Sequence, residues 1–384
     1  MQIGVAGLGT AGRLLISALQ TFSGMRLAAV ADPVADVCQS VASTFGVRAC
    51  RDLEDLCMRA EVDAVYIATP TALHAEHVAV AARAGKHILV EKPMAVSLDE
   101  AQSMVAEVSR AGVVMVVGHS HSFDAPIRRI REIVESGELG RLRMIHNIGF
   151  TDWIYRPRRP DELDLAQGGG ATFRQGAHQF DIIRYIGGGM LRSVRAQTFA
   201  WEPRRPTIGA HSAYLQFTDG AAATAVYNGY GAFLSAELSE GIGPTGLAIP
   251  ADSAGRARRK FRERAPGDEL VAKRERTQTL VGRTADFQPF FGFTLVSCEG
   301  GDIRQSREGL FIYDENGRRE EIVAKAVNAR HPVLEEFRDA ITSGVTPVHD
   351  GNWGMANLET CLAVIRSAEL NSEVMLLRQV PVRK

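Results

Sequence analysis

The sequence predicts an α/β protein with an N-terminal Rossmann dinucleotide-binding domain and a C-terminal α+β domain dominated by antiparallel strands. Three observations support this class. Short apolar runs alternate with helix-like segments over the first 120 residues, a glycine fingerprint follows the first run, and later strand-like segments follow one another. Alternating strands and helices are typical of a parallel sheet covered on both faces. We therefore expect two domains, 1–120 and 121–384.

The first domain is expected to contain five short strands, each nearly continuous in apolar residues. These strands are Ile3–Ala6, Leu27–Ala31, Val62–Ala68, His87–Val90 and Val113–Val117. A helix with apolar spacing begins near Leu14, and a second spans about 75–84. A third helix opens at the capping box Ser97–Glu100.

The second domain is expected to mix strands with helices. The expected helices are 127–134, 176–186, 332–342 and 355–370. The expected strands are 143–150, 194–201, 212–217, 221–230 and 293–297. The Arg-rich segment 255–276 has no clear periodicity, so it is interpreted as an exposed arm or an oligomer contact.

Composition argues against several classes of protein. The formal net charge of −1 favours neither nucleic acid nor an anionic membrane surface, and the longest apolar runs have only strand length. Met1-Gln2 leads directly into an apolar strand, which predicts no signal peptide. The five cysteines lack C-x-x-C spacing, so no metal site is expected and a cytoplasmic location with reduced thiols is favoured.

A dinucleotide fingerprint lies between the first strand and the first helix. Its residues are Gly7, Leu8, Gly9, Thr10, Ala11 and Gly12. The glycines permit a tight turn, close approach of a pyrophosphate and close helix packing. Asp32 follows the second strand, where a carboxylate binds ribose hydroxyls and repels a 2′-phosphate. NAD is therefore favoured over NADP, which remains the alternative.

Three further motifs resemble the glucose–fructose oxidoreductase / inositol dehydrogenase / MocA (GFO/IDH/MocA) family over essentially the whole chain. They are Thr69-Pro70 with His74, Glu91-Lys92-Pro93, and Gly168–Gly170 before His178-x-x-Asp181. The resemblance implies NAD(P) use, a large open sheet in the second domain and a homo-oligomer, a dimer or a tetramer, formed through that sheet. It also implies that Thr69, Pro70, His74, Glu91 and Lys92 lie at the cofactor.

Four segments resemble, more narrowly, the bacterial dihydrodiol dehydrogenases of phthalate and chlorobenzoate breakdown. They are 118–124, 153–159, 173–178 and 301–306. Those enzymes oxidise a carboxylated cis-dihydrodiol to a carboxylated catechol. The resemblance therefore implies a small carboxylated cyclic diol as the substrate.

Lys92 is the candidate proton acceptor. It follows a buried strand at the sheet edge where α/β proteins bind ligands, and lysine is rare here, with six in the chain. Desolvation there would lower the pKa of a lysine toward the working pH. The alternative is a solvated loop lysine.

His178 and Asp181 are expected on one helix face, with His178 bonding or relaying protons of substrate hydroxyls and Asp181 positioning it. The alternative is a buried histidine capped by an aspartate. Many relatives have an acidic residue where Arg174 stands, so an anionic substrate is favoured, because a guanidinium fits a carboxylate bidentately. His119 and His121 are further candidate substrate contacts, although a structural role is equally favoured.

The aromatic and proline-stiffened loop after residue 150 is a candidate lid. Trp153 and Tyr155 offer rings to a flat substrate, and Arg156 and Arg158 offer guanidinium groups to carboxylates. A solvated basic loop is the alternative. For the whole protein, a sugar, uronate or inositol dehydrogenase, a redox-neutral glycosidase with bound NAD, and an NAD-binding sensor without catalysis remain alternatives to the dihydrodiol dehydrogenase.

Overall fold

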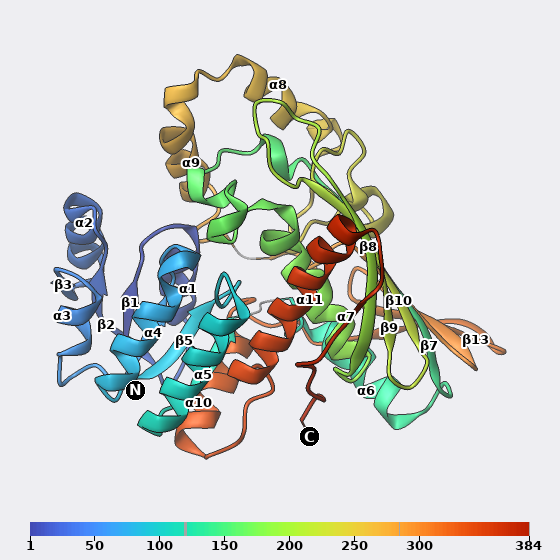
Figure 1. Cartoon of the computed structure of the whole chain (residues 1–384), viewed down its shortest axis with the longest axis horizontal. Coiled ribbons are helices and arrows are strands. Elements are labelled where there is room, and N and C mark those ends of the chain that lie inside the picture. Colours follow the sequence, from blue (N-terminus) through green and yellow to red (C-terminus); the bar gives the residue numbers. More distant parts are fainter. Residues whose placement is uncertain (119–120, 284, 384) are drawn as a thin grey trace.

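Two β-sheets lie side by side in the computed structural model, and the long helix α11 (Gly351–Leu370) runs between them (Figure 1). The structure describes residues 1–118, 121–283 and 285–383. One continuous core of buried apolar side chains includes residues of both sheets and of α11, such as Val90, Val364 and Leu215. No helix of these described residues is long and apolar enough to cross a membrane.

The first sheet has the order β3-β2-β1-β4-β5-β6, and all neighbouring strands are parallel. Its strands are β1 (Gln2–Ala6), β2 (Arg26–Ala31), β3 (Arg48–Cys50), β4 (Ala64–Ile67), β5 (His87–Glu91) and β6 (Met115–Gly118). Its helices are α1 (Thr10–Leu19), α2 (Ala35–Phe45), α3 (Leu53–Cys57), α4 (His74–Arg83) and α5 (Leu98–Ala111). The five expected strands are present, and the sheet gains the short edge strand β3.

The second sheet has the order β14-β13-β12-β11-β7-β10-β9-β8-β15. Its strands are β7 (Leu142–Phe150), β8 (Leu191–Phe199), β9 (Ala210–Phe217), β10 (Ala222–Asn228), β11 (Phe293–Cys298), β12 (Gly301–Gln305), β13 (Gly309–Asp314), β14 (Gly317–Ile322) and β15 (Val374–Met375). Only the β7–β10 pair is parallel among the pairs of this sheet in the described residues. The expected mainly antiparallel sheet is therefore confirmed.

Three further helices join the sheets: α6 (Ala125–Ser136), α7 (Ala177–Ile186) and α10 (His331–Thr342). A π-helical turn, Thr172–Gly176, leads directly into α7. Helix α10 packs in the same core cluster as α1, through Leu334 and Phe337. The C-terminal part of the chain thus returns to the first sheet, although the domain limits expected from the sequence stay a prediction.

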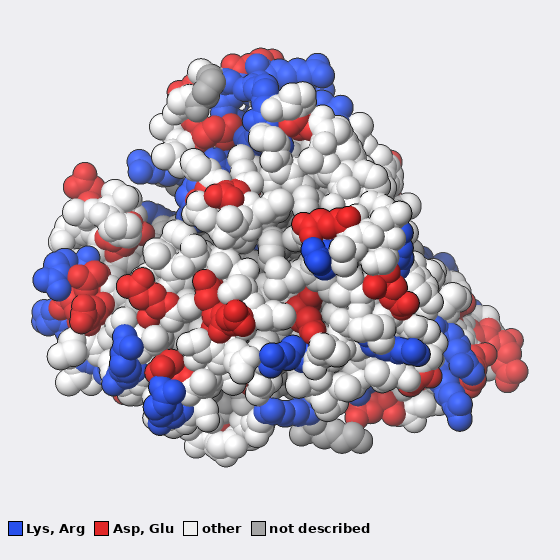
Figure 2. All heavy atoms as spheres, viewed as in Figure 1, with Lys and Arg blue, Asp and Glu red and all other residues white. Residues whose placement is uncertain are grey.

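The Arg-rich segment differs from its expectation. It folds into α8 (Arg256–Glu263) and α9 (Glu269–Gln278), which lie above the two sheets in Figure 1. Figure 2 shows Lys and Arg side chains gathered over this part of the surface. However, two ion pairs join this segment to the rest of the chain, Lys273 with Glu162 and Glu269 with Arg205. The segment is exposed over much of its length, as expected, but it is folded against the rest of the chain by ion pairs that no local pattern reveals. An oligomer contact through it stays a prediction.

Candidate active site

The glycine fingerprint forms a tight turn between β1 and the N-terminus of α1. Gly7 has φ +90°, and a Cβ there would lie 2.5 Å from the carbonyl oxygen of Ala68. A Cβ on Gly12 would lie 2.0 Å from the carbonyl oxygen of Gly7. A Cβ on Gly9, in contrast, would meet nothing within 4 Å. Open space above a helix N-terminus with no side-chain cap suits the pyrophosphate of a dinucleotide.

Asp32 lies at the end of β2, directly beside this turn. Its carboxylate accepts hydrogen bonds from the backbone N–H of Leu8 at 2.7 Å and of Val34 at 3.0 Å. Each carboxylate oxygen has a second lone pair. The carboxylate is therefore fixed in orientation and retains capacity for ribose hydroxyls.

Helix α9 reaches the same loop from the far end of the chain. The hydroxyl oxygens of Thr10 and Thr277 are 2.7 Å apart. The Thr277 hydroxyl donates to the carbonyl of Lys273, so Thr10 is the donor to Thr277. Ala11 follows Thr10 in the first turn of α1. The candidate cofactor loop is thus bounded by α9 as well as by the first sheet.

The loop after β4 carries the predicted cofactor residues Thr69 and Pro70, and the hydroxyl of Thr69 lies 2.9 Å from Nδ1 of His77. His74 is 1% exposed, and its ring nitrogens lie 3.0 Å from the carbonyl oxygens of Thr69 and Pro93. Burial lowers the pKa of His74 to about 4. His74 thus connects the loop after β4 with the loop after β5 and fixes their relative position.

Lys92 follows β5 at the junction of the two sheets. Its ammonium Nζ donates to the carbonyl oxygen of Arg174 at 3.0 Å. Burial lowers the pKa of Lys92 to about 8, and Arg174, Arg330 and Arg158 also lower it, while Glu91 raises it. A lysine with this pKa exchanges its proton near neutral pH and can act as a base.

Glu91, the residue before Lys92, is tied into the protein by three hydrogen bonds. Its carboxylate accepts from the hydroxyl of Tyr66 at 2.5 Å, from the guanidinium of Arg330 at 3.2 Å and from the backbone N–H of Lys92 at 3.2 Å. Burial raises its pKa, but Arg330 and Lys92 outweigh burial and hold it below the ordinary value. Glu91 therefore orients the Lys92 backbone as an anion.

Arg174 lies in the π-helical turn before α7, and its guanidinium is bonded to two side chains of the protein. Its guanidinium donates to the Thr71 hydroxyl at 3.2 Å and to Glu162 at 3.4 Å. Glu162 is 4% exposed and also pairs with Arg158 and Lys273. Burial raises the pKa of Glu162, but these cations hold it far below its ordinary value. Binding of a substrate carboxylate by Arg174 remains a prediction.

Two of the predicted substrate-contacting histidines, His121 and His178, lie against each other. The rings of His121 and His178 have centroids 4.8 Å apart, and both contact the ring of Phe291. Nδ1 of His121 lies 3.0 Å from the Asp124 carboxylate. Asp181, one turn after His178, accepts a 2.6 Å hydrogen bond from the indole N–H of Trp353. The remaining candidate, His119, lies outside the described residues.

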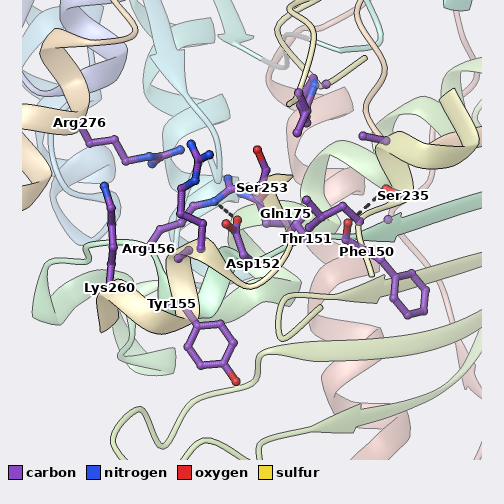
Figure 3. Close-up of a pocket in the computed structure, with 18 of the residues that line it drawn as sticks. Phe150, Thr151, Asp152, Tyr155, Arg156, Gln175, Ser235, Ser253, Lys260 and Arg276 are labelled. Atoms are coloured by element: carbon purple, nitrogen blue, oxygen red, sulfur yellow. Dashed lines mark hydrogen bonds and ion pairs between the residues drawn. The ribbon is translucent and has the colours of Figure 1, made fainter. Parts of the chain in front are cut away.

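A cavity of about 740 Å³ opens beside these histidines, between the loop after β7 and helices α8 and α9 (Figure 3). Tyr155 and Arg156 line it, as predicted for the lid loop, and the guanidinium of Arg156 donates to Asp152 at 2.6 Å. Trp153 is 1% exposed and carries the Arg158 guanidinium over its ring at 4.1 Å. These last two residues support the cavity wall from behind and are not part of its lining.

A chain of hydrogen bonds connects the cavity to Lys92. The side-chain amide of Gln175 donates to the Arg174 carbonyl at 2.9 Å, the same oxygen that Lys92 binds. Gln175 accepts from the Tyr227 hydroxyl at 3.4 Å, and Thr151 lies 2.7 Å from that hydroxyl. Gln175, Tyr227 and Thr151 all line the cavity, so the cavity wall shares the Arg174 carbonyl with Lys92, which is not itself part of the lining.

Sequence reasoning missed several residues of this site: Glu162, Gln175, Tyr227, Arg276 and Phe291. Gln175 lies between two residues of the recognised Phe173–His178 segment, so its position was an available signal. The others occupy segments that carry no motif. Their role arises only when the chain folds.

Comparison with known proteins identifies the family of this chain. Residues 1–119 match the model of an oxidoreductase family with an NAD-binding Rossmann fold, and residues 127–233 match a GFO/IDH/MocA C-terminal domain. The chain is 36% identical to 1-carboxy-3-chloro-3,4-dihydroxycyclohexa-1,5-diene dehydrogenase of Comamonas testosteroni, over 96% of this chain and 95% of that protein. The chain belongs to the GFO/IDH/MocA family. The predicted family is confirmed, and the protein is an oxidoreductase.

Three further proteins match this chain with different identity and coverage. Myo-inositol 2-dehydrogenase of Thermotoga maritima is 32% identical, over 51% of this chain and 58% of that protein. The crystal structure of a dehydrogenase from Bordetella bronchiseptica RB50 has a TM-score of 0.93 and 38% identity, covering 98% of this chain and 99% of that one. Levoglucosan dehydrogenase, solved with NADH and levoglucosan, has a TM-score of 0.76 at 19% identity, covers 98% and 99%, and shares the fold.

Proposed function

We propose that this GFO/IDH/MocA enzyme oxidises a carboxylated cis-dihydrodiol to the corresponding carboxylated catechol with NAD⁺. The observation that carries the proposal is Lys92, a lysine with a pKa of about 8 next to a cavity walled by arginines. The name of the Comamonas testosteroni relative supports a carboxylated cyclohexadiene diol as the substrate class.

In this proposal, the bound nicotinamide supplies the hydride acceptor. Neutral Lys92 removes the proton of the reacting hydroxyl, and the carbonyl of Arg174 holds its Nζ in place. The hydride leaves the carbinol carbon with its electron pair, and a C=O bond forms there. The resulting enone tautomerises to the catechol, and the gain of aromaticity favours the forward direction.

The histidine pair has a binding role in this proposal. His178 and His121 pack against Phe291, which also lines the cavity. Their imidazole nitrogens can donate to or accept from the substrate hydroxyls. Asp181 does not contact the substrate in this proposal. Its carboxylate accepts the hydrogen bond of the Trp353 indole and positions the helix that carries His178.

Cofactor choice follows from Asp32. Its carboxylate, fixed by two backbone N–H groups, would bond the hydroxyls of the adenosine ribose and repel a 2′-phosphate. NAD is therefore proposed over NADP. We also propose that the protein works as a homo-oligomer, as the family resemblance implies.

A substrate panel tests the function. The purified enzyme is incubated with NAD⁺ or NADP⁺ and with carboxylated cis-dihydrodiols, inositols, sugars and uronates, and reduced cofactor is followed at 340 nm. We expect the highest kcat/KM with a carboxylated dihydrodiol and NAD⁺. Preference for an inositol, a sugar or a uronate would contradict the proposal, and so would cofactor binding without turnover of any panel member.

A further inference from the structure

The wall of the cavity carries more basic groups than its acidic groups neutralise. Five basic residues line it: Arg156, Arg256, Lys260, Arg264 and Arg276. Three acidic residues line it: Asp152, Glu263 and Glu275. The lining therefore has two more basic than acidic residues, and acids outside the lining, Asp252 and Glu269, pair with two of the basic ones.

The arginines of the wall differ in how they are paired. Arg156 pairs with Asp152, Arg256 with Asp252 and Arg264 with Glu269. No hydrogen bond or ion pair joins the Arg276 guanidinium to another side chain in the described part of the chain, although the carboxylates of Asp152 and Glu162 attract it. Its side chain is also partly buried, whereas the amine of Lys260 is exposed.

Arg276 and Arg156 approach the same space from different elements. Figure 3 shows Arg276 extending from α9 toward Arg156, whose guanidinium is held on the other side by Asp152. Burial, together with repulsion by Arg156, lowers the pKa of Arg276 to about 10. A partly buried guanidinium that donates to no side-chain acceptor, next to a second guanidinium, offers free donors to an anion that binds between them.

We propose that Arg276 and Arg156 form the receptor for the substrate's carboxylate, with Arg276 as the specificity-determining residue that α9 brings over the cavity. The inference rests on the proposed function and deepens it. The opposite side of the cavity, at Gln175 and Phe291, adjoins Lys92 and His178. A ring bound with its carboxylate at Arg276 would therefore extend toward Gln175, which shares the Arg174 carbonyl oxygen with Lys92.

The assignment moves the anion contact away from Arg174. The donors of the Arg174 guanidinium are engaged by Thr71 and Glu162. Arg174 instead serves the site through its carbonyl, which binds Lys92. The Arg-rich segment, expected to be an exposed arm, thereby gains a role in selecting the substrate.

Kinetics of Arg276→Gln on two substrates test the inference. We expect kcat/KM for a carboxylated cis-dihydrodiol to fall about 100-fold, because a charge-assisted contact is lost, while a carboxylate-free cis-dihydrodiol keeps its value. Arg274→Gln, an exposed residue of the same helix with the same charge change, is the matched control and should behave as the wild type. Equal losses on both substrates, or no loss, would overturn the inference.

Binding of phthalate gives a readout that does not need turnover. Isothermal titration of the NAD-loaded enzyme should show phthalate binding that weakens at least about tenfold in Arg276→Gln and is unchanged in Arg274→Gln. Should the wild type oxidise no diol, the proposed function fails, and this titration still decides the inference. Equal phthalate affinity in wild type and Arg276→Gln refutes it. Should Arg276→Gln not fold, Arg276→Lys, which keeps the charge without the planar fork, should also bind phthalate more weakly.

Discussion

At the scale of single residues, burial determines what the charged groups of this site can do. Lys92 is partly desolvated, and its pKa falls to about 8 because burial outweighs the nearby Glu91. Glu162 is buried even more completely, yet it stays ionised because Arg158, Arg174 and Lys273 surround it. Burial thus favours the neutral amine of Lys92, whereas the surrounding cations keep the Glu162 carboxylate ionised.

The pKa of Lys92 predicts the pH dependence of oxidation. Only the neutral amine can accept a proton, so kcat/KM should rise with pH and level off above pH about 8. Lys92→Arg keeps the positive charge but cannot act as a base, and it should lose about 10² to 10⁴ in rate. Steady-state kinetics from pH 6 to 10 measure both effects. A fully active Lys92→Arg variant with an unchanged profile would exclude Lys92 as the base.

Glu162 predicts a loss of stability. Glu162→Gln leaves three cations without their shared carboxylate, so the free energy of unfolding should fall by about 3–5 kcal/mol. Glu369→Gln breaks an exposed pair with Arg366 and should cost less than about 1 kcal/mol. Urea unfolding measures both variants. Similar small losses in the two would show that the buried cluster contributes no more than a surface pair.

At the scale of secondary structure, the elements that burial alone defines were predictable and those fixed by distant contacts were not. Strands β1, β4 and β5 are covered on both faces, so each leaves a continuous apolar run in the sequence. Helix α9 has no such signal, because distant contacts hold it in place. Lys273 bonds to Glu162, 111 positions earlier, and Thr277 bonds to Thr10, 267 positions earlier. The dinucleotide loop was found from its spacing, whereas the cavity that adjoins Lys92 required the fold.

The N-terminus of α1 allows cofactor binding and stability to be separated. Gly9→Ala adds a methyl group into open space, so the free energy of unfolding without cofactor should change by less than about 0.5 kcal/mol. The same methyl group would occupy the space suited to the pyrophosphate, and NAD⁺ affinity should fall about tenfold or more. Gly12→Ala should instead destabilise the fold, since its Cβ would lie 2.0 Å from the Gly7 carbonyl oxygen. Fluorescence titration with NADH and thermal unfolding distinguish these outcomes, and unchanged affinity in Gly9→Ala would exclude this cofactor position.

At the scale of the whole molecule, segments far apart in sequence meet around one site. Helix α10 packs beside α1, α11 lies between the sheets, and α9 reaches the glycine loop. The contact between Thr10 and Thr277 is important because α9 also carries Arg276. One short helix therefore touches both the candidate cofactor loop and the candidate anion receptor, so we expect binding of the two ligands to be linked.

Thr277→Val tests this linkage. The variant loses the bond to Thr10 and the bond within α9 to the Lys273 carbonyl. Loss of the bond to Thr10, worth about 0.5–1.5 kcal/mol, should loosen α9 and raise the KM for both NAD⁺ and the carboxylated substrate about two- to tenfold. The melting temperature should change little, because the contact lies outside the two main cores. Thr342→Val removes an exposed hydroxyl that bonds only within its own helix region, and it should leave both constants unchanged. If Thr277→Val affected neither constant, α9 would not couple the two sites. A change in the KM for NAD⁺ alone would limit its role to the cofactor loop.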